Sequence, residues 1–229
     1  MENKQMLETL QKKMKESVPD FELRFKNESK FMKFLGKLLF FNKSFMTGFI
    51  TTIATKVYWT TKEKFDSDPV RSFLTLAHEY VHVLDHVQKP VRFPLGYLFP
   101  QILAAPALLF VLLSPVLIPL IALGILSPYL LLSLVTLAFL APIPSPGRKS
   151  AEMRGYGMSI KVNTWLYGSV NQNYIDWCAK QFTGPAYFYM WPFESKVKKE
   201  LAEWADIHNL KCLSDKNRAY KEVFDIIKV

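Results

Sequence analysis

Cysteine and histidine are scarce in this chain of 229 residues, which has two of the first and four of the second. Cys178 and Cys212 form no CxxC motif and no cluster with histidine, which argues against a disulfide framework and a cysteine-based metal site. We expect both to be reduced, buried thiols. The N-terminal stretch MENKQMLETLQKK lacks an apolar core, which excludes a cleavable secretory signal.

Acidic residues are outnumbered by basic ones, 20 to 29, so the formal net charge is +9. Such a basic excess could bind nucleic acid or an anionic membrane surface, or it could have no specific partner. No basic run is interleaved with aromatic residues and no nucleic-acid-reading motif is present, so we expect no nucleic acid partner. An anionic membrane surface is therefore the better match for the basic excess. Half of the residues are hydrophobic, which excludes a disordered chain.

Charge is missing altogether from residues 93–147, a run of 55 positions without Asp, Glu, Lys, Arg or His. About 20 apolar residues suffice to span a bilayer, so the run predicts a two-helix transmembrane hairpin. We place the spans at 97–114 and 121–141, with the turn at 114–119. A re-entrant hairpin and an apolar helix pair in a soluble core are the alternatives.

Basic residues flank the apolar run on both sides: Lys89 and Arg92 precede it, and Arg148, Lys149 and Arg154 follow it. Short loops rich in Lys and Arg stay on the cytoplasmic side of a membrane. The sequence therefore predicts an integral membrane protein with two spans, and with both termini on the cytoplasmic side.

The chain accordingly divides into an N-terminal part (1–92), the hairpin (93–147) and a C-terminal part (148–229). We expect strands at 21–26 and 49–60, and helices at 1–17, 30–41, 70–87, 149–168, 171–182, 194–208 and 215–227. The predicted fold class is α+β, mostly helical, with the two polar parts forming one catalytic domain. The aromatic stretch 185–193 could line a cleft, lie at the membrane interface or pack in the core.

The motif with the clearest chemistry is His78-Glu79-Tyr80-Val81-His82, an HExxH. Asp68 and Pro69 predict the start of the helix that contains it. On a helix the two histidines share one face, one turn apart, and can both reach a Zn²⁺ ion at about 2.0–2.1 Å. Glu79 lies beside them as the general base that takes a proton from zinc-bound water. The active site then lies on the cytoplasmic side.

A catalytic zinc ion needs a third protein ligand, and Glu152 is the strongest candidate. It is the first acidic residue after the apolar run, at the start of a predicted helix, and two membrane spans return the chain to the side where His82 lies. His86 is excluded because it lies about 12 Å along the helix from His78. His208 is a more remote candidate.

Other polar residues have supporting roles in this interpretation. Asp85 shares the helical face of the two histidines, so it could accept an imidazole N–H, or it could be a solvated helix carboxylate. Tyr156 lies one turn from Glu152 and is our preferred donor to the oxyanion, with Arg154 and His208 as alternatives.

The combination of HExxH, a hydrophobic hairpin and a later helix bearing Glu152 resembles the HtpX-like and CAAX-prenyl-protease-like membrane gluzincins. The resemblance covers roughly residues 45–165 and implies a gluzincin-like zinc peptidase core with Glu152 as the third ligand. In those families an Asp often follows the ligand Glu by four residues, where this chain has Tyr156. By the same resemblance the strand at 49–60 could lie beside an extended substrate, and a plain core strand is the alternative.

The predicted function is that of a membrane-anchored, zinc-dependent metalloendopeptidase in which Glu79 activates the attacking water. Its partners would be a protein or peptide substrate and the lipid bilayer. The alternative is a membrane-structural or pore-associated protein with a degenerate or structural metal site, in which the hairpin alone is the working part.

Overall fold

The computed structural model describes residues 3–39, 42–187, 189–206, 213 and 217–228. The α-helices are α1 (Asn3–Ser17), α2 (Lys30–Leu38), α3 (Lys62–Ser67), α4 (Pro69–Gln88), α5 (Arg92–Leu98), α6 (Ala105–Ala122), α7 (Pro146–Tyr167), α8 (Gln172–Thr183), α9 (Glu194–Ala205) and α10 (Arg218–Lys228). The 3₁₀-helices are η1 (Gln101–Ala104), η2 (Pro128–Leu140) and η3 (Pro185–Tyr187), and the strands are β1 (Glu22–Phe25), β2 (Thr51–Ile53) and β3 (Lys56–Trp59). The described chain is mostly helical with one small sheet, which confirms the predicted class at that level.

The sheet has the order β1-β3-β2, with β1 parallel and β2 antiparallel to the central strand. The single strand predicted at 49–60 is instead a β-hairpin, in which Thr51 lies opposite Tyr58. The chain reverses at Ala54, whose φ of 55° is left-handed. The reversal was missed because the segment contains none of the Gly, Pro, Asn or Asp residues that usually indicate a turn.

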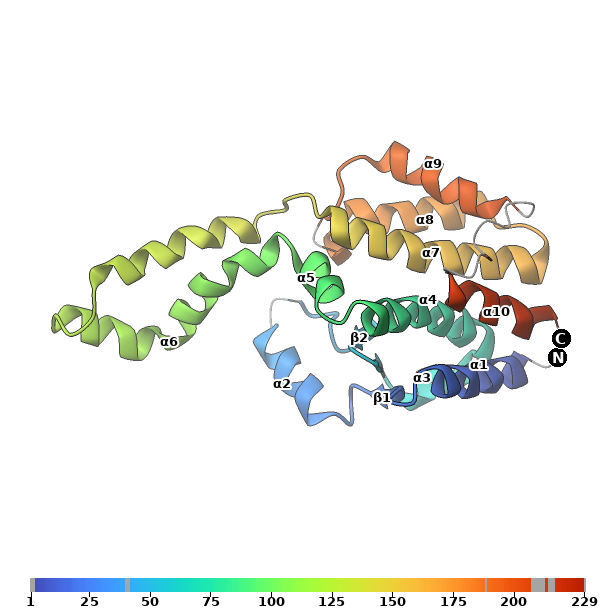
Figure 1. Cartoon of the computed structure of the whole chain (residues 1–229), viewed down its shortest axis with the longest axis horizontal. Helices are drawn as coiled ribbons and strands as arrows, with labels where there is room; N and C mark the ends of the chain where they lie inside the picture. Colours follow the sequence, from blue (N-terminus) through green and yellow to red (C-terminus); the bar gives the residue numbers. More distant parts are fainter. Residues whose placement is uncertain (1–2, 40–41, 188, 207–212, 214–216, 229) are drawn as a thin grey trace.

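Helix α4 lies in the middle of the main hydrophobic core, packed against α1, α7 and α10 (Figure 1). Its fully buried side chains Phe73, Leu76, Tyr80 and Val83 face apolar residues of those helices. A second core cluster joins the other side of α7 to α8 and α9. Helix α7 therefore belongs to both clusters. It packs directly against α4, and this contact joins the N-terminal and C-terminal parts of the chain.

The apolar run leaves this body as a long arm made of α6 and η2 (Figure 1). The two segments lie side by side, and the Ala107 N–H donates a hydrogen bond to Thr136 Oγ1 at 3.3 Å. Residues 101–122 form a helical stretch that is long and apolar enough to cross a membrane, and few of its side chains are buried. The second stretch, η2, is apolar and shorter.

The boundaries within the arm differ from the prediction. The turn predicted at 114–119 lies inside α6, which continues past Pro115 and Pro119, and the chain reverses near Gly124. Gly124 has a φ of 70°, a conformation that glycine adopts without strain. The two prolines predict a turn at 114–119, whereas the structure turns at Gly124 and retains both prolines in the helix.

Candidate metal centre

Helix α4 carries the two histidines on a frame that is fixed at both ends. The Asp68 side chain accepts a hydrogen bond from the Arg71 backbone N–H at 3.0 Å, and Pro69 occupies the first turn, as the sequence predicts. At the other end the Lys89 backbone N–H donates to the Asp85 carbonyl. The uninterrupted helix between these points places residues four apart on one face.

Three buried side chains from two helices meet between α4 and α7. His78 and His82 are 5% and 6% exposed, and Glu152 is 2% exposed. The two Nε2 atoms lie 3.1 Å apart. Glu152 Oε2 lies 3.5 Å from His78 Nε2, and Oε1 lies 3.7 Å from His82 Nε2. The structure thus brings the glutamate singled out from the sequence to the histidine pair.

The spacing of these three donors matches a four-coordinate ion. Two ligand atoms at about 2.0–2.1 Å from a tetrahedral centre lie roughly 3.3 Å apart. The two Nε2 atoms are 3.1 Å apart, and each lies 3.5 or 3.7 Å from its nearer Glu152 oxygen, so one ligand atom from each residue lies within 4.8 Å of the others. Oε2 of Glu152 is also buried without a hydrogen-bond partner, an arrangement that a bound cation would satisfy. The group could therefore hold a metal ion, and it is the one such group found among the described residues.

The electrostatics of the cluster favour the ionised carboxylate. Burial by itself would raise the pKa of Glu152, but the charges and hydrogen bonds of His82 and His78 outweigh it and hold that pKa well below its ordinary value. Burial by itself would lower the pKa of His82, but the charge and hydrogen bond of Glu152, together with the charges of Glu79 and Asp85, outweigh it and raise that pKa. Glu152 is consequently in the form that a metal ligand requires.

Helix α7 can approach the histidines this closely because residue 155 is glycine. A Cβ atom added there would lie 2.5 Å from His78 Nε2 and 2.6 Å from His78 Cε1, well inside van der Waals contact. Glycine inside a helix costs roughly 1 kcal/mol relative to alanine. Glycine within a helical pattern is a sequence signal for close packing, and it could have drawn attention to Gly155 and to Gly157 in the same helix.

Glu79 is held in place from the sheet. Its Oε2 atom accepts a hydrogen bond from Thr52 Oγ1 of strand β2 at 2.6 Å. Lys26, which directly follows strand β1, is fully buried, and its Nζ donates to the carbonyls of Phe45 and Phe49 at 2.7 and 2.8 Å. Burial lowers the pKa of Lys26 to about 8, opposed by the charge of Glu79. Neither Thr52 nor Lys26 was singled out from the sequence.

His78 and Glu79 form part of the wall of a cleft with a volume of about 510 Å³. Its walls come from the segment before β2, the N-terminal half of α4, and helices α7 and α8. Tyr156 and the aromatic side chains of Tyr174 and Trp177 line the side opposite the sheet. A cleft of this volume is typical of a ligand or substrate site.

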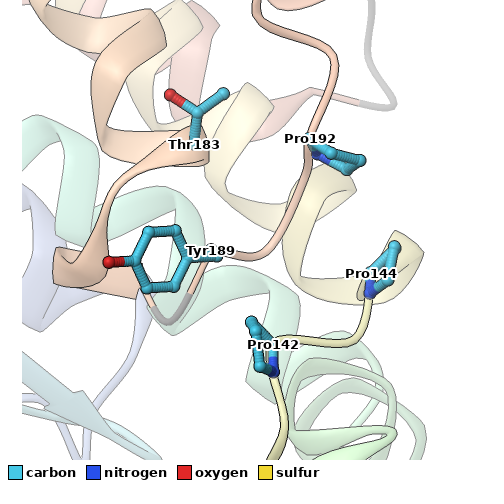
Figure 2. A pocket seen from close by; sticks show the side chains of 5 residues that line it. All are labelled: Pro142, Pro144, Thr183, Tyr189 and Pro192. Atoms are coloured by element: carbon cyan, nitrogen blue, oxygen red, sulfur yellow. The ribbon is translucent and has the colours of Figure 1, made fainter.

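A second hollow, of about 460 Å³, lies between the segment that follows η2 and the loop after α8 (Figure 2). It is lined by Pro142, Pro144, Thr183, Tyr189 and Pro192. None of these residues is a usual metal ligand or a group that titrates near neutral pH, and none belongs to the histidine–glutamate cluster. The chemistry of the molecule is therefore assigned to the cleft beside His78.

Two tyrosine hydroxyls lie next to the metal group. The Tyr156 ring packs edge-on against His78 with ring centroids 4.9 Å apart, and its hydroxyl donates to that of Tyr187 at 3.3 Å. Burial raises the pKa of both phenols well above the ordinary value, so both remain protonated donors. Tyr156 was predicted from its spacing to Glu152. Tyr187 belongs to the aromatic stretch 185–193, for which several roles were left open.

Tyr97 is a residue of the site that the sequence did not reveal. Its hydroxyl donates a hydrogen bond to Glu152 Oε1 at 2.6 Å. The buried guanidinium of Arg148 in turn donates to the Tyr97 carbonyl at 3.1 Å and to the Tyr187 carbonyl at 3.3 Å. The sequence placed Tyr97 in a membrane span, and nothing in its neighbourhood indicates that α5 packs on α7.

We expect Tyr97→Phe to weaken Zn²⁺ binding by about tenfold, because loss of a hydrogen bond to a ligating carboxylate typically costs 10- to 100-fold in metal affinity. The ring remains in place, so packing is preserved. Competition with a chromophoric chelator measures the affinity. Tyr167→Phe is the matched control, since Tyr167 is exposed at the end of α7. Equal affinities for the two variants would contradict this role.

Asp85 has a different partner from the one predicted. Its Oδ2 atom accepts from Arg154 Nη2 at 2.7 Å, whereas the buried His82 Nδ1 has no hydrogen-bond partner. Burial raises the pKa of Asp85, with Arg154 opposing that shift. The Arg154 guanidinium is a stronger hydrogen-bond donor than an imidazole N–H. Because Asp85 and Arg154 pair with each other, Asp85 does not accept from an imidazole and Arg154 is not placed to bind the oxyanion. His208 lies outside the described residues, as does Cys212, whereas Cys178 is a free, buried thiol.

Comparison with known proteins finds no matching family model, no matching curated protein and no matching solved structure. Function is accordingly inferred from the side chains themselves. They define a candidate metal centre of two histidines and one glutamate, with a second carboxylate and two phenols beside it.

Proposed function

We propose that the protein is a membrane-anchored zinc metallopeptidase that hydrolyses peptide bonds at the membrane surface. The observation that carries the proposal is the convergence of His78, His82 and Glu152 next to Glu79. Both His78 and Glu79 border the cleft, so substrate can approach the metal group from that side. Three protein ligands with access for a fourth are typical of catalytic zinc, whereas structural sites are closed by four protein ligands.

Zinc held there would supply an acidified water and a Lewis acid for the peptide carbonyl. Glu79 takes the proton from the attacking water and delivers it to the departing amine. Thr52 fixes the orientation of the Glu79 carboxylate through its 2.6 Å hydrogen bond. Tyr156 and Tyr187 are protonated and joined by a hydrogen bond on the cleft wall, so this pair has one further O–H that could donate to negative charge on the carbonyl oxygen.

The arrangement of the elements supports the resemblance to membrane gluzincins. In this proposal the β2–β3 hairpin, the HExxH helix α4 and the Glu152 helix α7 form the gluzincin-like core. The apolar arm is then the transmembrane hairpin that interrupts it. Among the described strands β2 pairs with β3 alone, so we propose that an extended peptide adds to its other edge and passes Glu79.

Dimensions and charge support two membrane crossings. At about 1.5 Å per residue, α6 alone is roughly 27 Å long. The 13 residues of η2 extend roughly 26 Å at about 2.0 Å per residue, and the hydrocarbon core is about 30 Å thick. The basic residues on both sides of the arm favour a cytoplasmic location for the two termini and the metal centre in this proposal.

Metal removal tests the function. We expect the purified full-length protein to contain about one zinc ion per chain. It should cleave an internally quenched peptide library, lose activity on chelation and regain it with added zinc. Mass spectrometry of the metal and fluorescence of the peptides are the readouts, with magnesium addition as the control. Folded protein without bound metal would overturn the proposal. Bound zinc without hydrolysis would favour a membrane-structural or pore-associated protein.

A further inference from the structure

Helix α2 has an exposed apolar face. Phe31, Phe34 and Leu38 are 50%, 65% and 56% exposed. At 3.6 residues per turn these three side chains fall within an arc of roughly 60°. The helix is attached to the body through a different face, where Met32 is fully buried and Gly36 lies so close to Met46 that an added Cβ would meet it at 2.9 Å.

A row of lysines adjoins the apolar face. Lys30, Lys33 and Lys37 are all exposed, and none makes an ion pair with another described residue. The sequence of α2, KFMKFLGKL, contains no acidic residue. An apolar arc beside a purely basic arc is the pattern of a helix that lies in the plane of an anionic membrane interface.

The position of α2 fits the same partner. It lies at the end of the body from which the apolar arm leaves (Figure 1). Leu95, Leu98 and Phe99, in and just after α5, are likewise about half exposed. A bilayer that surrounds the arm would thus face both helices.

We infer that α2 binds the surface of an anionic bilayer, with Phe31, Phe34 and Leu38 inserted at the boundary between headgroups and acyl chains. The lysines then contact the lipid phosphates and carboxylates. A second copy of this chain fits less well, because the two lysine rows would repel one another. The inference rests on the membrane location in the proposed function and is independent of hydrolysis.

Docking of α2 has a consequence for the cleft. Gly36 packs against Met46, and the residues that immediately follow, Thr47 and Gly48, line the cleft beside the metal group. The residue that contacts α2, Met46, is therefore next in sequence to residues of the cleft wall. A docked α2 holds this wall next to the bilayer, so the polypeptide that reaches His78 is a segment adjoining the membrane.

Site-specific quenching tests the docking. The full-length chain, in a Cys178→Ala and Cys212→Ser background, carries an environment-sensitive fluorophore on Phe34→Cys. It is reconstituted with brominated phosphatidylcholine, with or without phosphatidylserine. We expect strong quenching when phosphatidylserine is present. A label on Lys12→Cys, exposed on α1, should remain unquenched, and one on Leu112→Cys in the arm should be quenched in both lipids.

Charge reversal provides the second measurement. Replacing Lys30, Lys33 and Lys37 by Glu should remove most of the phosphatidylserine-dependent quenching at position 34, since each lysine near an anionic surface contributes about fivefold to binding and three contribute roughly 100-fold. Quenching at 112 without quenching at 34 would overturn the inference and leave the membrane anchor intact. Absence of quenching at both positions would overturn both. Shielding at 34 that depends on protein concentration in detergent would instead identify an interface between copies.

Discussion

If the protein is the proposed zinc peptidase, replacing Glu79 by Gln is expected to lower the rate of peptide hydrolysis by roughly 10²- to 10⁴-fold, the usual contribution of a general base, and to leave zinc affinity unchanged. The carboxylate of Glu79 is not among the three donors that converge between α4 and α7. Glutamine preserves the volume of the side chain, and its carbonyl oxygen still accepts the hydrogen bond from Thr52. It cannot accept a proton from the attacking water. The measurement is kcat/KM together with the zinc content of the same sample.

Glu28→Gln is the matched control, because Glu28 is exposed and lies outside the cleft. The same substitution there removes one negative charge and should leave both readouts at the wild-type level. Activity of Glu79→Gln within about tenfold of wild type would assign the base to another residue. Loss of zinc from Glu79→Gln would mean instead that Glu79 is a ligand.

The three candidate metal ligands were accessible from the sequence because their relation is mostly local. The helix that carries His78 and His82 is fixed by Asp68 and Pro69, and four residues along a helix define a distance without knowledge of the fold. Glu152 required one topological step, namely that two crossings of a membrane return the chain to the same side. The mostly helical class with a small sheet followed from residue patterns of the same local kind.

The residues around the ligands were not accessible, because each depends on how separate elements pack. Thr52 reaches Glu79 from an edge strand, and Tyr97 reaches Glu152 from a helix 55 positions earlier in the chain. Asp85 had the right helical phase for an imidazole, yet Arg154 on α7 is its partner. Spacing along one helix cannot show that a residue on a second helix is the hydrogen-bond partner.

Gly155→Ala tests whether the packing of α7 on α4 sets the metal geometry. Alanine is the better helix former by about 0.8–1.0 kcal/mol, so local propensity favours the substitution. The added methyl group would, however, lie 2.5 Å from His78 Nε2. Overpacking of this kind costs about 1–3 kcal/mol. The imidazole relieves the clash by turning away from Glu152, because the surrounding helix backbone cannot move as readily.

The expected result is a Zn²⁺ affinity lowered by roughly 100-fold, since about 1.4 kcal/mol corresponds to a factor of ten, in a protein whose thermal unfolding is little changed. Chelator competition and calorimetric unfolding measure the two quantities. Gly96→Ala is the matched control, because a Cβ there meets no atom within 4 Å and the residue also lies in a helix beside the site. Wild-type affinity in a folded Gly155→Ala variant would show that the site tolerates a wider separation of α4 and α7. A matching loss in Gly96→Ala would attribute the effect to helix stiffness rather than to the contact with His78.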